Sequence, residues 1–133
     1  MTQADKELLI KDLCARLPYG VKVRTSFGGE IRNDKVQLNF AQLSLFEAGH
    51  EDVKPYLFPL SSMTEAQRKE YHNLCSVGTD ECGDIIYFDT YESIDYLNKN
   101  KFDYRYLIPM RLANDATGLN IYSDVDGIIS YRK

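Results

Sequence analysis

The chain has 133 residues, of which 44% are apolar and 27% are charged, and its formal net charge is −4. This length and composition are typical of one soluble globular domain that can bury a core without disulfides. No apolar run approaches the ~18 residues needed to cross a membrane, and the charged N-terminus resembles no export signal, so we expect a cytoplasmic protein.

The first third of the chain predicts a helix followed by two strands. From Gln3 onward, apolar residues recur every three to four positions among charged ones, and Pro18 ends the resulting helix. Residues 21–27 and 36–40 each alternate apolar with polar side chains, which is typical of half-buried strands. We expect these strands to pair in an antiparallel hairpin, across a connection that is too long for a two-residue turn.

The middle of the chain contains two prolines and the start of a helix. Pro55 and Pro59 fix their own φ and favour extended geometry in the residues before them, so they hold the three residues between them in a stiff segment. Thr64 followed by Gln67 is a capping box, which predicts a helix over residues 65–76.

The remaining elements are predicted from apolar runs and turn signals. Residues 85–88 form a continuous apolar run, consistent with a central strand. Asp89 and Glu92 suggest a second capping box, for a helix over residues 90–98. Residues 43–53 fit either a helix or a strand, and we predict a helix. Residues 119–122 and 128–131 are predicted to form a terminal hairpin.

Helices interspersed with hairpin signals predict an α+β fold. We expect an antiparallel or mixed sheet with three to four helices, in one compact domain that spans residues 1–133. The main core should contain these side chains: Leu13, Val23, Leu38, Tyr56, Leu57, Leu60, Leu74, Ile86, Phe88, Ile94, Leu97, Phe102, Leu107 and Ile108.

Two segments are similar to those of an uncharacterised protein family. Residues 54–67 read KPYLFPLSSMTEAQ, and residues 93–113 read SIDYLNKNKFDYRYLIPMRLA. They resemble the segments KPYLxPLSSMTE and LNKNxFDYRxLI of small proteins encoded by gut Bacteroidales, their phages and their mobile elements. This chain has Phe58, Tyr96 and Tyr106 where the family usually has arginine, tryptophan and glycine. The resemblance implies a phage or mobile-element origin, and it carries no activity or site residue with it.

Neither an enzyme nor a metal site is favoured by the sequence. No serine lies in a GxSxG motif, and the single glycine pair lacks the spacing of phosphate-binding loops. His72, Cys75 and Cys82 could share a metal ion, but they lack the closely spaced ligand pairs of zinc sites. We therefore predict no metal and no cofactor, and three free thiols.

Acidic residues are concentrated in the middle third of the chain. Residues 51–95 contain ten acidic residues and three basic ones. Such a charge disfavours contact with phosphate backbones, so nucleic acid is not an expected partner. The densest cluster is interpreted as a solvated loop rather than a cation or acid–base site, and it comprises Asp80, Glu81, Asp84 and Asp89.

Tyrosine is unusually frequent, with 10 residues in the chain. A tyrosine ring buries apolar area and keeps its hydroxyl in water, which suits protein interfaces. We therefore predict a small accessory protein that binds another protein through Tyr87, Tyr91, Tyr104, Arg105 and Tyr106.

Two other functions stay open. A small-molecule binder or a small enzyme would have a pocket near the segment from Pro55 to Pro59, with Asp84, Asp89 or His72 as its polar groups. An acidic mimic of nucleic acid would align the carboxylates of residues 80–95 in a row.

Overall fold

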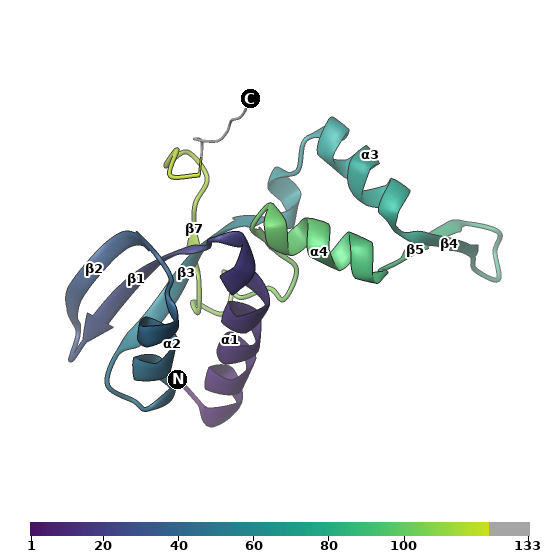
Figure 1. Ribbon diagram of the computed structural model, residues 1–133. Coiled ribbons are helices and arrows are strands. Elements are labelled where there is room, and N and C mark those ends of the chain that lie inside the picture. Colours follow the sequence, from purple (N-terminus) through teal and green to yellow (C-terminus); the bar gives the residue numbers. More distant parts are fainter. Residues whose placement is uncertain (123–133) are drawn as a thin grey trace.

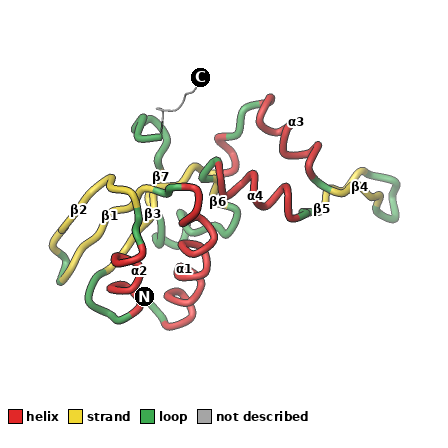
Figure 2. The backbone as a smooth tube through the Cα atoms, in the orientation of Figure 1, coloured by secondary structure: helices red, strands yellow, loops and turns green. Residues whose placement is uncertain are grey.

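The computed structural model describes residues 1–122, in which four α-helices and seven strands form the predicted α+β fold (Figures 1 and 2). The helices are α1 (Gln3–Arg16), α2 (Phe40–Glu47), α3 (Glu65–Leu74) and α4 (Tyr91–Lys99). The strands are β1 (Lys22–Phe27), β2 (Glu30–Gln37), β3 (Asp52–Pro59), β4 (Ser76–Thr79), β5 (Ile85–Phe88), β6 (Phe102–Asp103) and β7 (Asn114–Asp115). The helix predicted within residues 43–53 is therefore confirmed in its first part, as α2.

Each of the four helices begins at a capping box, in which the cap residue and the third helical residue exchange hydrogen bonds. The predicted pair Thr64 and Gln67 is confirmed at α3. At α4 the prediction of Asp89 and Glu92 was wrong, because the cap is Thr90 with Ser93. Asp89 instead accepts a hydrogen bond from the Ser93 hydroxyl, at 2.9 Å.

The main sheet has the strand order β2-β1-β3-β6, and β7 also pairs with β3. Strands β1, β2 and β3 pair in antiparallel fashion, whereas β6 and β7 run parallel to β3. The expected long connection between β1 and β2 was wrong. Phe27 pairs directly with Glu30, because Gly28 and Gly29 both have positive φ, of 61° and 82°, and form a two-residue turn.

Strand β3 contains both prolines and still lies inside the sheet. Its first half, through Pro55, pairs with β1, and its second half pairs on the other side with β7 and then β6. Each half of β3 is therefore hydrogen-bonded to a neighbouring strand on one side only. On the other side, the missing N–H of a proline costs no hydrogen bond. Where the β1 ladder stops, the Tyr122 hydroxyl accepts from the Lys22 amide at 2.7 Å and donates to the Tyr56 carbonyl at 2.7 Å.

Two hydrophobic clusters hold these elements together. In the first, α1 and α2 cover one face of the sheet, and its buried members include Leu13, Phe46 and Leu57 (Figure 1). The second joins α3 and α4 to β6 around Met63, Leu97 and Phe102. Most of the predicted core residues are buried or packed against these clusters.

The predicted place of residues 85–88 in the core was wrong. β5 pairs only with β4 among the described residues, and the two strands form a separate hairpin. Phe88 and Leu74 are exposed and Ile86 is only half-buried. Of the predicted terminal hairpin, residues 119–122 form no strand, and residues 128–131 lie outside the described residues.

Candidate functional site

The hairpin of β4 and β5 projects away from the main sheet, beyond the ends of α3 and α4 (Figure 1). We call residues 74–92, which include this hairpin and the start of α4, the hairpin arm. It has a defined structure, because hydrogen bonds close it at both ends. At its base, the Thr90 hydroxyl donates to the Leu74 carbonyl at 2.6 Å. At its tip, one Asp80 oxygen accepts from the amides of Cys82 and Asp84, both at 2.9 Å.

Helix α3 contacts the hairpin arm through two side chains. The Tyr71 hydroxyl donates to Asp89 at 2.6 Å. Burial, reinforced by this carboxylate, raises the pKa of Tyr71 well above its usual range. The ring of the next residue, His72, stacks on Tyr87 with their centroids 3.8 Å apart and an angle of 4° between the rings. These contacts orient the hairpin and leave most of its apolar area uncovered.

Both faces of the hairpin are apolar and exposed. Directly opposite residues share a face, so Val77, Ile85 and Tyr87 lie on one face and Phe88 lies on the other. The exposed fractions are 62% for Val77, 64% for Ile85, 43% for Tyr87 and 53% for Phe88, and the neighbouring Tyr91 is 90% exposed. The Phe88 ring lies across Gly78, where an added Cβ would come within 3.0 Å of it. A strand pair that is apolar on both faces is typical of a sheet covered on both sides.

The hairpin arm and the adjoining parts of α3 and α4 are also strongly acidic. Residues 70–98 contain no lysine or arginine and seven carboxylates, which are Glu70, Asp80, Glu81, Asp84, Asp89, Glu92 and Asp95. The predicted acidic cluster therefore lies on the same projection as the exposed apolar side chains. A surface of this kind favours a partner that brings apolar area and positive charge.

The structure separates the predicted contact residues into two places. Tyr87 and Tyr91 lie on the hairpin arm, whereas Tyr104, Arg105 and Tyr106 follow β6. Arg105 donates to the buried Asp12 at 2.8 Å and to the Tyr104 hydroxyl at 2.8 Å, and both residues are half-buried. Tyr106 is exposed on its own, with a positive φ of 59°.

Asp12 is also paired with Arg16, through a 2.9 Å contact between two side chains that are fully buried. Arg16 in turn donates to the Phe102 carbonyl at 2.7 Å, so this network ties α1 to β6. The four-residue spacing of Asp12 and Arg16 on a predicted helix was the signal that the sequence carried for it. Tyr104 and Arg105 belong to this network through their hydrogen bonds, so they stabilise the fold.

A further ionic cluster, which sequence patterns did not predict, lies on the face of the sheet opposite α1. Asp34 pairs with Arg24 at 3.1 Å and with Lys35 at 3.2 Å, and it accepts from the Tyr56 hydroxyl at 2.5 Å. The Arg24 and Tyr56 hydrogen bonds hold the pKa of Asp34 well below its usual range. These contacts cover the buried Tyr56 ring.

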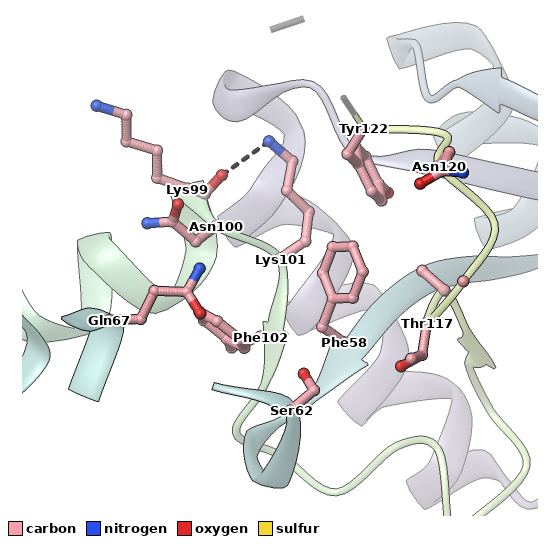
Figure 3. Close-up of a pocket in the computed structure, with 12 residues that line it drawn as sticks. Phe58, Ser62, Gln67, Lys99, Asn100, Lys101, Phe102, Thr117, Asn120 and Tyr122 are labelled. Atoms are coloured by element: carbon pink, nitrogen blue, oxygen red, sulfur yellow. Dashed lines mark hydrogen bonds between the residues drawn. The ribbon is translucent and has the colours of Figure 1, made fainter. Parts of the chain in front are cut away.

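A pocket of about 440 Å³ lies between β3, the end of α4 and the segment after β7 (Figure 3). Phe58 and Phe102 form apolar parts of its wall, and amide, hydroxyl and lysine side chains form the rest. The Lys101 amino group donates to the carbonyls of Lys99 and Tyr19, at 2.8 and 3.0 Å. The polar groups predicted for a pocket near Pro55 to Pro59, namely His72, Asp84 and Asp89, do not line it.

Within residues 1–122, no three His, Cys, Asp or Glu side chains are grouped so that they could hold a metal ion. None of the helices described is both long and apolar enough to cross a membrane. Comparisons with protein-family models, with curated proteins and with solved structures found no match. The geometry alone therefore has to carry a functional proposal.

Proposed function

We propose that this chain is a small accessory protein that binds another protein through its hairpin arm. The exposed apolar side chains on both faces of β4 and β5 carry this proposal. Covering them would remove apolar surface from water, which stabilises a complex by about 25 cal/mol per Å² buried. The resemblance of residues 54–67 and 93–113 to phage and mobile-element proteins supports an origin in a phage or a mobile element.

The test is a comparison of two matched double variants. Val77→Ser with Ile85→Ser removes apolar area from the arm, whereas Phe27→Ser with Ile31→Ser does the same at the tip of the β1–β2 hairpin, where both side chains are also exposed. Partners are captured with the tagged chain from a Bacteroidales lysate and identified, and their affinity is then measured by calorimetry. We expect the arm variant to lose about 2 kcal/mol or more of binding energy and the control to bind like the native chain. Equal binding by all three proteins, or the absence of any captured partner, would contradict the proposal.

Binding of a small molecule is a second candidate, and it is supported by the pocket beside Phe58. Its volume of about 440 Å³ lies within the range of ligand sites, and aromatic walls with several amide and hydroxyl groups suit a neutral polar compound. Thr117→Phe would fill the rim of this pocket from an exposed position. If fragments that bind the native chain in ligand-observed NMR bind this variant equally well, the pocket is not their site.

A further inference from the structure

We infer, building on the proposed function, that the hairpin arm binds a basic, apolar segment of its partner protein as an added β-strand. The first reason is that the hairpin has free edges. β4 and β5 pair only with each other in the described part of the chain, so each presents an outer row of backbone donors and acceptors. Such edges are templates for an extended segment, whose main chain supplies the hydrogen bonds of recognition.

The second reason is the distribution of apolar side chains. An added strand continues the pleat, and its successive side chains point to opposite faces of the sheet. On this hairpin both faces would receive apolar neighbours, from Val77 and Ile85 on one side and from Phe88 on the other. A segment with apolar side chains would thus gain cross-strand contacts on either edge.

The third reason is the negative charge on and beside the hairpin arm, which determines what kind of molecule can bind there. The seven carboxylates of residues 70–98 have no lysine or arginine among them. A second copy of the same arm would bring the same carboxylates together, and nucleic acid or an anionic membrane would also be repelled. Lysine or arginine next to the apolar residues of the segment would instead be attracted to the exposed Glu81, Asp84 and Glu92.

The probe for this inference is a fluorescein-labelled peptide of about eight residues, in which four consecutive valines, which point alternately to the two faces of a strand, are flanked by lysines at both ends. Two comparison peptides separate charge from strand pairing. One has glutamate in place of lysine, and the other has the original sequence with N-methyl groups on alternate amides, which removes the hydrogen bonds of one edge. Binding to the full chain is followed by fluorescence anisotropy at low salt and at physiological salt.

We expect the basic peptide to bind, more weakly as salt rises, and both comparison peptides to bind at least about tenfold more weakly. The triple variant E81Q, D84N and E92Q should also reduce affinity about tenfold, because it removes three exposed carboxylates that attract the lysines. The arm itself should keep its structure, since none of these carboxylates has a role in the cap or turn hydrogen bonds described above. The matched control E7Q, E30Q and E47Q neutralises three exposed carboxylates of the body and should bind like the native chain.

Several results would overturn the inference. No binding of the basic peptide, or equal binding of the acidic one, would show that charge does not select the occupant. Equal binding of the N-methylated peptide would exclude strand addition. An arm-dependent dimer of the chain in sedimentation experiments would identify a second copy as the occupant. If the native partner bound the triple variant normally but lost affinity for the Val77 and Ile85 variant, the proposed function would stand and only this inference would fail.

Discussion

The side chain of Tyr122 completes the sheet at a place where the strands themselves do not. Its hydroxyl lies between β1 and β3, where the hydrogen bonds between the two strands end. It accepts a hydrogen bond from the Lys22 amide and donates one to the Tyr56 carbonyl. Burial raises the pKa of Tyr122 well above its usual range, since the charged form would lose its hydration there.

Replacing Tyr122 by phenylalanine should therefore lower the free energy of unfolding by about 1–3 kcal/mol, because the Lys22 amide and the Tyr56 carbonyl lose their partner at a partly buried position. Urea denaturation followed by circular dichroism would measure the change. Tyr91→Phe is the control, because Tyr91 is almost fully exposed, and it should change stability by less than about 0.5 kcal/mol. Similar losses in the two variants would show that the Tyr122 hydroxyl does not bridge the strands.

Tyr106 is a second residue that affects the free energy of unfolding, through its own backbone conformation. Its φ of 59° lies in the left-handed region, which favours glycine. Tyr106→Gly should leave the melting temperature unchanged or raise it, because relief of backbone strain offsets the greater entropy of the unfolded chain. Tyr106→Val should lower stability by about 1–2 kcal/mol, because a β-branched residue is strained at positive φ. A loss on glycine substitution larger than the loss on valine substitution would contradict this account.

Helices α3 and α4 pack against each other but bury different amounts of their surfaces. No residue of α3 is fully buried, whereas α4 buries Leu97 in the second cluster. The sequence pattern placed Leu74 in the core. In the structure it is 36% exposed, because it lies at the end of α3 where the hairpin arm leaves the body.

Leu97→Ala should accordingly cost about 2–5 kcal/mol through lost burial and a residual cavity. Leu74→Ala should cost less than about 1 kcal/mol, because most of the surrounding space is solvent. Chemical denaturation of both variants would measure the difference between the helices. Equal costs would mean that the end of α3 is covered in solution, as it would be if two chains associated through the hairpin arm.

Across the folded chain, tyrosines make stability sensitive to alkaline pH. Burial is the largest cause that raises the pKa of Tyr71, Tyr96 and Tyr122, and for Tyr96 it raises the pKa to about 12. The unfolded chain has tyrosine pKa values of about 10, so it releases these protons first as pH rises. The stabilisation that Tyr96 contributes is therefore complete below about pH 10 and is lost as the pH rises to about 12.

We expect the urea midpoint to fall steadily above about pH 10. Tyr96→Phe should make this fall less steep, because one residue that resists ionisation in the folded state is gone. The exposed Tyr91 provides the control, and Tyr91→Phe should leave the slope unchanged. A slope that is identical in the native chain and in Tyr96→Phe would show that Tyr96 ionises as easily in the folded chain as in the unfolded one.

Local signals predicted much of the architecture. The capping box at Thr64 and Gln67, the periodicity of α1 and the alternation in β1 depend on residues a few positions apart, so the sequence contains the complete interaction. The β1–β2 turn was equally local but was missed, because the second strand was predicted only from residue 36, whereas β2 begins at Glu30.

Long-range contacts account for what sequence patterns could not predict. The apolar run of residues 85–88 indicates a strand whose two faces tend to be buried. No local pattern indicates whether the chain's own core or a partner buries them. Tyr104 and Arg105 have the composition of an exposed contact, yet Arg105 reaches Asp12, 93 residues away. Burial depends on which distant parts of the chain pack together, and local sequence preferences carry no information about that packing. The amino-acid order alone therefore predicted the four helices, strands β1 and β5 and the acidic character of residues 51–95. The placement of residues 76–88 on a projecting, uncovered hairpin followed from tertiary packing.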